Sequence, residues 1–115
     1  MLFLGLGTGL GSALIVDGLL QPLELAHLPY KSGKTYEDFI GVRGLKRLGK
    51  GKWRRHVVDV VNQFKAAMEA EYVVLGGGNA KLLDKLPNNV IAGDNSLAFL
   101  GGQRVWMKKF AGTYK

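Results

Sequence analysis

The sequence LFLGLGTGLGSALIVDG, at residues 2–18, predicts two antiparallel strands joined by a glycine-rich turn. The strands are the apolar runs 2–6 and 12–16, which lie on either side of the glycines. Asp17-Gly18 is a strong hairpin signal, and a third strand is expected over 19–26. These three strands would form an antiparallel meander.

The rest of the chain alternates predicted helices and strands. Residues 31–34 are expected to form a polar loop, after which Thr35 can cap a weak helix that starts at Tyr36 and is interrupted by Gly41 and Gly44. The later elements are helix 53–70, strand 72–75, helix 80–85 capped by Asn79, strand 90–92, and a last helix from 94 or 95 to about 106. This order predicts an α/β fold, a mixed five-stranded sheet with an antiparallel β-meander followed by β-α-β-α units.

Composition indicates one soluble globular domain over 1–115. The chain has 115 residues, of which 47% are hydrophobic, and this suits a single domain. The absence of cysteine excludes disulfides, thiolate metal sites and a cysteine nucleophile. The uncharged stretch at the start is shorter than the ~20 residues of a membrane span and lacks the positive region of a signal peptide. We therefore expect a cytoplasmic protein that does not engage a membrane.

The first glycine cluster is a candidate phosphate site. A glycine-rich turn after a buried strand exposes backbone N–H groups, and such a concavity binds phosphate oxygens. The spacing fits neither the dinucleotide fingerprint nor the P-loop, so the anion would lie in a hairpin turn. The phosphate ligands are expected from Gly7, Thr8, Gly9 and Gly11. The alternative is a tight hairpin that needs glycine only for its backbone conformation.

A second glycine turn follows the strand 72–75. Its residues are Gly76, Gly77, Gly78 and Asn79. Glycines at the carboxyl end of a strand let a ligand lie against the backbone, and open α/β sheets bind ligands at this edge. The alternative is again a turn that needs glycine for its geometry alone.

The chain resembles a known family at three places. Residues 6–18 resemble the phosphate-binding hairpin of ROK-family sugar kinases, in the actin-like ATPase superfamily, and 76–79 resemble their adenosine-contacting turn. Glu24 and His27 match the Glu-x-Gly-His motif through which this family contacts sugar hydroxyls, although Ala26 stands where glycine is usual. The lack of a cysteine-rich zinc motif points to the zinc-free branch similar to polyphosphate glucokinases, with no structural metal expected.

The resemblance implies a fold, a reaction and partners. The fold would be a ribonuclease H-like (actin-like ATPase) half-fold, and the chain would be the C-terminal, nucleotide- and sugar-binding lobe of a glucokinase-like kinase. The full enzyme would transfer a phosphoryl group from ATP or polyphosphate to a hexose, with glucose favoured and Mg²⁺ required. The resemblance implies that adenosine is bound by Gly76, Gly77, Gly78 and Asn79. It implies that the sugar is bound by Glu24 and His27.

No catalytic residue is expected within this chain. In the family, the general base is an aspartate upstream of the phosphate hairpin, so the resemblance implies an N-terminal lobe supplied in cis or as a split partner. A homodimer remains an open alternative. The competing hypothesis is a non-catalytic, regulatory module that binds nucleotide or a polyanion on the same half-fold. The family members that bind DNA are repressors with an added DNA-binding domain, and no such domain is expected in this chain. Nucleic acid is therefore not the expected partner.

A stripe of cations carries the whole net charge of +7. It consists of Arg43, Lys46, Arg47, Lys50, Lys52, Arg54 and Arg55, with no acid among them. Such a run is usually a solvated face, which is the interpretation that we favour. It could instead bind a polyanion, with Trp53 stacking on a base. Polyphosphate would then be the attractive ligand and nucleic acid its competitor.

Overall fold

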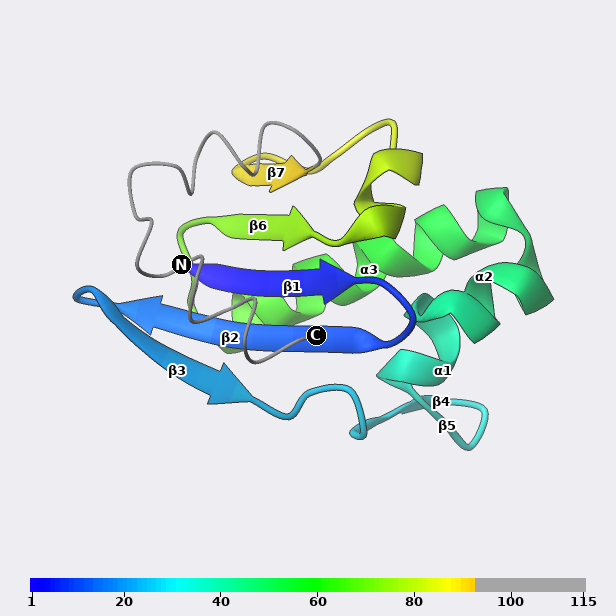
Figure 1. The fold of residues 1–115 in the computed structure, drawn as a ribbon, viewed down its shortest axis with the longest axis horizontal. Helices are drawn as coiled ribbons and strands as arrows, with labels where there is room; N and C mark the ends of the chain where they lie inside the picture. Colours follow the sequence, from blue (N-terminus) through cyan, green and yellow to red (C-terminus); the bar gives the residue numbers. More distant parts are fainter. Residues whose placement is uncertain (93–115) are drawn as a thin grey trace.

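The computed structural model describes residues 1–92, in which five strands form one mixed sheet (Figure 1). The strand order is β3-β2-β1-β6-β7. Neighbouring strands are antiparallel among β1 to β3, whereas β6 and β7 run parallel to β1. The strands are β1 (Leu2–Leu6), β2 (Leu10–Val16), β3 (Leu19–Leu23), β6 (Val73–Gly76) and β7 (Val90–Ala92). The predicted α/β fold with a mixed five-stranded sheet is thus confirmed.

The meander is more tightly connected than its sequence suggests. β2 begins at Leu10, two residues before the expected strand, because Leu10 pairs with Leu6 and only 7–9 remain in the turn. β3 ends at Leu23, three residues early. The chain leaves the sheet there because the Leu25 N–H donates to the Ser12 hydroxyl (3.4 Å) instead of continuing the ladder.

A small hairpin replaces the polar loop expected at 31–34. β4 (Pro29–Lys31) pairs antiparallel with β5 (Lys34–Thr35). Ser32 and Gly33 both have left-handed backbones, with φ of 56° and 70°. Two consecutive residues of this kind form the turn that matches the twist of a hairpin. The Ser-Gly pair was therefore a turn signal that sequence inspection assigned only to a loop.

Three helices follow, and the first has the predicted cap. α1 (Tyr36–Ile40) starts with a capping box, in which the Asp38 N–H donates to the Thr35 hydroxyl (3.2 Å) and the Thr35 N–H donates to the Asp38 carboxylate (3.0 Å). The Thr35 backbone N–H lowers the pKa of Asp38 below its usual range. Gly41 separates α1 from α2 (Val42–Leu48) as expected.

Gly44 does not interrupt a helix, contrary to the prediction. It lies within α2, is buried, and a Cβ at this position would overlap the Phe39 carbonyl group. Glycine therefore lets the start of α2 pack directly against the end of α1.

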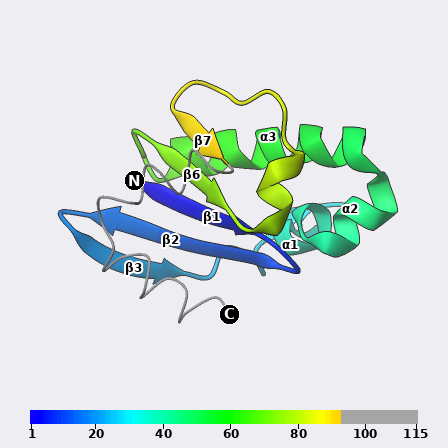
Figure 2. The same ribbon diagram turned by 45° about the horizontal axis from the view of Figure 1, so that its top comes forward.

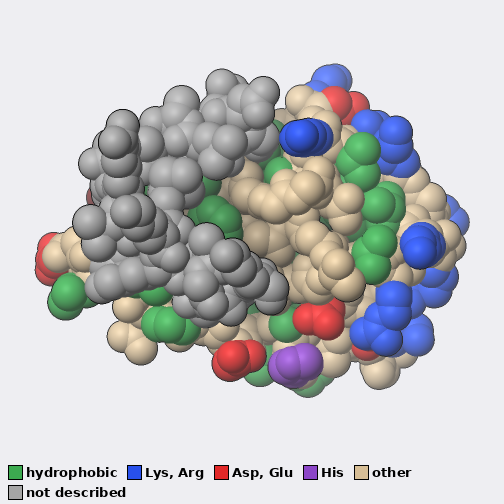
Figure 3. Space-filling model, viewed as in Figure 1, with side chains coloured by type: hydrophobic (Ala, Val, Ile, Leu, Met, Phe, Trp, Pro, Cys, Tyr) green, Lys and Arg blue, Asp and Glu red, His purple; other side chains and the backbone are tan. Residues whose placement is uncertain are grey.

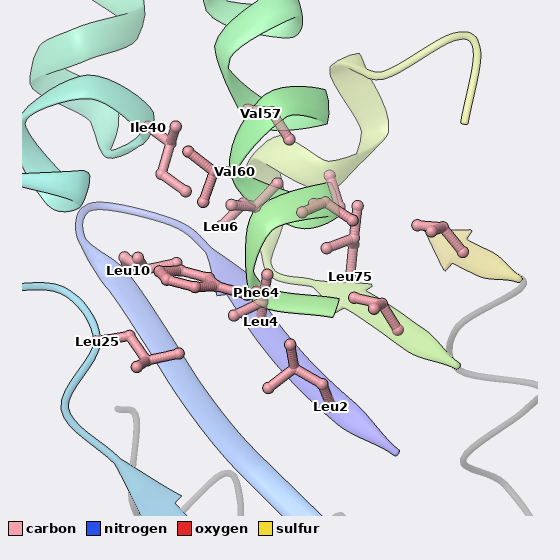
Figure 4. Close-up of a cluster of buried hydrophobic side chains, with 14 of the residues drawn as sticks. Leu2, Leu4, Leu6, Leu10, Leu25, Ile40, Val57, Val60, Phe64 and Leu75 are labelled. Carbon is pink, nitrogen blue, oxygen red and sulfur yellow. The ribbon is translucent and has the colours of Figure 1, made fainter. Parts of the chain in front are cut away.

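α3 (Lys50–Ala67) crosses one face of the sheet (Figure 2). It begins three residues before the predicted start at Trp53 and ends three before the predicted end at Ala70. The periodic apolar face was correctly predicted, because Val57, Val61 and Phe64 are buried. Side chains from this helix meet alternate residues of β1 in the core (Figure 4). The labelled members of this contact are Val57, Val60 and Phe64 from α3 and Leu2, Leu4 and Leu6 from β1.

Trp53 belongs to this core, which corrects its suggested role as a base-stacking residue. Its side chain is 0% exposed. Its indole N–H donates to the Ile40 carbonyl oxygen (3.1 Å), so its polar atom is also satisfied inside the protein. A ligand cannot reach this ring without unfolding the end of the helix.

The segment after β6 is a 3-10 helix, η1 (Gly78–Leu82), where an α-helix over 80–85 was expected. Gly77 is its N-cap, and Asn79 does not cap it. The last predicted helix, from 94 or 95 to about 106, lies outside the described residues. Within residues 1–92, no helix is both long and apolar enough to cross a membrane.

Candidate functional site

The two glycine turns lie side by side at one edge of the sheet. β1 and β6 are adjacent and parallel, with Gly5 opposite Gly76, so the chain leaves both strands at the same end (Figure 1). The Asn79 side-chain amide donates to the Gly7 carbonyl oxygen (3.3 Å) and links the turns directly. This is the carboxyl edge at which parallel α/β sheets bind ligands.

The second turn needs its glycines for packing. Gly77 has a φ of 87°, and a Cβ there would overlap the carbonyl group of Leu6. A Cβ on Gly76 would lie 2.6 Å from the ring of Phe3. Gly78 is exposed and has open space where its Cβ would lie. The turn is therefore held against β1, and its free surface is at Gly78.

The first turn is open where the second is packed. Gly7 has no left-handed φ, and no heavy atom lies within 4 Å of the position of a Cβ. Nothing in residues 1–92 therefore requires glycine at this position. Thr8 is exposed at the tip, and its carbonyl oxygen accepts from the Val42 N–H (3.1 Å), which fixes the turn on the start of α2. Gly11 lies in β2 opposite Gly5, outside the turn itself.

A carboxylate that the sequence did not reveal lies against the first turn. The Glu37 side chain accepts from the Leu10 N–H (3.4 Å), and a Cβ on Gly9 would lie 3.0 Å from its nearer oxygen. Glu37 is 27 residues from Leu10 along the chain, so no local pattern could pair them. An acid at this position puts negative charge beside N–H groups that would otherwise face a bound anion.

Glu24 and His27 lie on the loop that follows β3. Because β3 is antiparallel to β2, this loop starts at the edge that carries the first glycine turn. Both side chains are exposed. The loop is fixed by a turn in which the Leu28 N–H donates to the Leu25 carbonyl oxygen (3.2 Å), and by the Glu37 N–H, which donates to the carbonyl oxygen of buried Ala26 (3.1 Å).

Asp17 lies at the opposite end of the meander. It forms the turn between β2 and β3 with a φ of 52°, at the other end of β2 from the first glycine turn. Seven residues of strand separate the two, which is on the order of 20 Å. Asp17 is therefore too far away to act on a ligand held at the glycine turns.

The seven cations of the stripe divide into paired and unpaired groups. Arg43 forms an ion pair with Asp38 (3.0 Å), Arg54 pairs with Asp84 (3.6 Å), and Arg47 lies over the ring of Phe39. Lys and Arg side chains gather at the same end of the molecule as the glycine turns (Figure 3). The cations of the stripe with no ion pair or ring contact among residues 1–92 are Lys46, Lys50, Lys52 and Arg55.

Comparisons with known proteins agree with this architecture. Neither the protein-family models nor the curated proteins gave a match. Among solved structures, the chain is similar to the inorganic polyphosphate/ATP-glucomannokinase from Arthrobacter sp. strain KM, with 26% identity and a TM-score of 0.61 over 93% of this chain. The ROK hexokinase from Thermus thermophilus shares the fold, with 19% identity and a TM-score of 0.59 over 88% of this chain.

The chain spans about half the length of both structures, 46% of the glucomannokinase and 54% of the hexokinase. The chain therefore contains a ROK sugar kinase-like domain.

Proposed function

We propose that the chain is the C-terminal, nucleotide- and sugar-binding lobe of a glucokinase-like kinase that transfers a phosphoryl group from ATP or polyphosphate to a hexose. The observation that carries this proposal is the contact between the two glycine turns, made through Asn79 and the Gly7 carbonyl oxygen. The fold, a ribonuclease H-like half, would present this edge to a second lobe. The similarity to a polyphosphate/ATP-glucomannokinase supports the choice of donor.

Each part of the edge has chemistry that suits one portion of the substrates. Backbone N–H groups of a glycine turn suit phosphate oxygens, and because the Gly7 N–H donates to the Gly9 carbonyl oxygen (3.2 Å), the donors of this turn would be those of Thr8 and Gly9. The open surface at Gly78 and Asn79 would contact adenosine. Further along the edge, a carboxylate at Glu24 can accept from sugar hydroxyls, and His27 can donate or accept.

We propose that the general base lies outside the described residues. Phosphoryl transfer to a hydroxyl needs a base and close positioning of both substrates, and Asp17 lies at the wrong end of β2. We therefore propose a second lobe, in cis or as a separate chain, that closes over this edge. This arrangement agrees with a chain that spans 46% of the glucomannokinase.

Mg²⁺ would neutralise charge on the transferred phosphates. Among residues 1–92, however, no three His, Asp or Glu side chains form a group that could hold a metal ion.

Calorimetry with ATP, tripolyphosphate and glucose tests the ligand assignments. We expect ATP or tripolyphosphate to bind, and Gly7→Ala to weaken that binding at least tenfold, because its methyl group would lie where phosphate oxygens approach. Gly51→Ala is a matched control, since Gly51 also has open space around it but lies in α3. An unchanged number of binding sites, each with unchanged affinity, in the Gly7 variant would refute the phosphate assignment.

Glucose binding tests the sugar assignment separately. We expect glucose to bind and Glu24→Gln to weaken it, because an amide accepts more weakly than a carboxylate does. The alternative, a non-catalytic module, is tested by assaying glucose phosphorylation by the chain together with its encoded partner lobe. Nucleotide binding without phosphorylation of any hexose would favour the module.

A further inference from the structure

Two aromatic rings next to His56 each carry a cation. The His56 ring packs edge-on against Tyr30, with centroids 5.8 Å apart, and against Phe39, with centroids 4.8 Å apart. The Lys31 ammonium lies over the Tyr30 ring (4.7 Å), and the Arg47 guanidinium lies over the Phe39 ring (5.0 Å). Stacking on the rings holds both cations near the imidazole.

Two more cations reach the same place from α3. Lys52, Arg55 and His56 are spaced i, i+3 and i+4 along the helix, so they share one face. Together they line a shallow, open depression on the surface. Lys31 and Arg47, the two ring-bound cations, belong to β4 and α2, so the cluster combines residues from β4, α2 and α3.

This cluster is not neutralised from within the protein. None of Lys31, Arg47, Lys52 and Arg55 forms an ion pair among residues 1–92. The acid whose charge acts on the imidazole is Asp59, whose carboxylate already accepts from the Tyr30 hydroxyl (2.5 Å) and the Gln63 amide (3.2 Å). Like charges gathered around one depression repel one another, and a bound anion would relieve that repulsion.

The hydrogen bonds of His56 leave one ring nitrogen available. Tyr30 has a single hydroxyl proton, which it donates to Asp59. The His56 Nδ1, 3.0 Å from the same hydroxyl oxygen, must therefore be the donor of their contact. The Nε2 has no hydrogen-bond partner within residues 1–92. Once protonated, it can donate to an anion in the depression that His56 lines.

We propose that Lys52, Arg55 and His56, flanked by Lys31 and Arg47, form a binding site for linked phosphate groups. The open shape suits an extended anion that spans several cations, whereas a single phosphate would fit a closed pocket better. Arg presents a planar fork of donors that matches phosphate oxygens. The site uses none of the residues assigned to the glycine turns, so it does not depend on the function proposed for them.

Binding there would leave a signature on His56. Burial lowers the pKa of His56, and the charges of Lys31, Arg55 and Arg47 lower it further, while Asp59 opposes them. The uncharged groups that face the His56 ring are Tyr30, whose pKa is raised by burial, and Phe39. An anion beside the ring favours the protonated form. Its binding should therefore raise the pKa of His56 and become tighter as the pH falls through that pKa.

The test is an NMR titration of the native chain, which has only two histidines. We expect saturating tripolyphosphate to raise the pKa of His56 by roughly half a unit or more, in line with the effect of a nearby opposite charge. His27 lies outside the depression and reports separately on the edge with the glycine turns. A shift at His56 with no ligand binding at the glycine turns would support this site while refuting the proposed function.

Matched variants identify the cations responsible. Lys52→Gln/Arg55→Gln removes two exposed charges and should abolish the shift at His56. Lys65→Gln/Lys85→Gln removes two charges elsewhere and should retain it. No shift at His56 with tripolyphosphate, or an equal shift in the first double variant, would overturn the proposal.

Two further ligands define the source of the phosphates. A shift with ATP as large as that with tripolyphosphate would identify a nucleotide's phosphates as a sufficient ligand, and a shift with tripolyphosphate alone would identify inorganic chains. A single-stranded DNA oligonucleotide that shifts His56 when tripolyphosphate does not would overturn the proposal in favour of nucleic acid.

Discussion

The two glycine turns follow neighbouring strands, yet they contain glycine for different physical reasons. In the second turn, Gly77 is left-handed and lies directly on the Leu6 carbonyl group, so the fold itself excludes a side chain. In the first turn, Gly7 has ordinary backbone geometry and open space around it. A Cβ at that position would meet no atom of another element, so packing does not select glycine there. Packing therefore explains the glycine at 77 and does not explain the glycine at 7.

The largest expected effect is on the packed turn. Gly77→Ala should lower the free energy of unfolding by roughly 2 to 5 kcal/mol, because it combines left-handed strain with overlap on the β1 backbone. Urea unfolding measures this change. Gly78→Ala is the control, since a Cβ there meets no heavy atom within 4 Å. Similar losses in both variants would contradict the idea that packing selects glycine at 77.

A smaller effect concerns the charge beside the open turn. Glu37→Gln should tighten tripolyphosphate binding about fivefold, because it removes about 1 kcal/mol of repulsion while keeping an acceptor for the Leu10 N–H. Calorimetry at low and high salt measures the gain, which should shrink as salt rises. Glu71→Gln, an exposed acid before β6, should leave affinity unchanged. Weaker binding by the Glu37 variant would show that the carboxylate assists the ligand.

The helix cap behind the open turn offers a third comparison. Thr35→Ala should cost about 1 kcal/mol of unfolding free energy, because the Asp38 N–H at the start of α1 loses its acceptor. Thr35→Ser retains a hydroxyl and should retain most of the stability. Urea midpoints compare the variants. α1 carries Glu37, which accepts from the Leu10 N–H. In Thr35→Ala, hydrogen exchange of the Leu10 N–H should therefore increase more than that of the Gly77 N–H. Equal increases at both amides would contradict a coupling between the cap and the open turn.

The smallest stability effect is expected at Gly7. Gly7→Ala should change the free energy of unfolding by less than about 0.5 kcal/mol, as for surface positions without special geometry. The Gly7→Ala variant should instead bind tripolyphosphate more weakly. A thermal melt of the variant used for calorimetry provides the check. Marked destabilisation would mean that the open turn is also required by the fold.

Local patterns predicted most of the framework. The strands around the first turn, the Thr35 cap and the buried face of α3 depend on neighbours within a few residues, so the sequence reveals them. The errors arose in short segments, whose few residues carry little periodic pattern. Residues 29–35 form a hairpin where a loop was expected, and 78–82 form a 3-10 helix where an α-helix was expected.

The site was predictable only in part. Both glycine turns could be found from composition, and their adjacency follows once β1 and β6 are parallel neighbours. Glu37 could not be placed, because its contact with Leu10 crosses 27 residues. The interpretation of Trp53 failed for a related reason. A helix pattern does not say how far the core extends, and the first turn of α3 proves to be buried at this residue.

The sequence by itself determined the α/β class, the positions of the two glycine turns and a cationic stripe, because propensity, spacing and charge are properties of the chain. Only the tertiary structure decided which glycines are packed and which are open, since that depends on atoms from other elements. It likewise decided that Lys31 and His56, outside the stripe, join Arg47, Lys52 and Arg55 in one cluster. Contacts between distant segments follow from how helices and strands pack, and a linear pattern does not encode those distances.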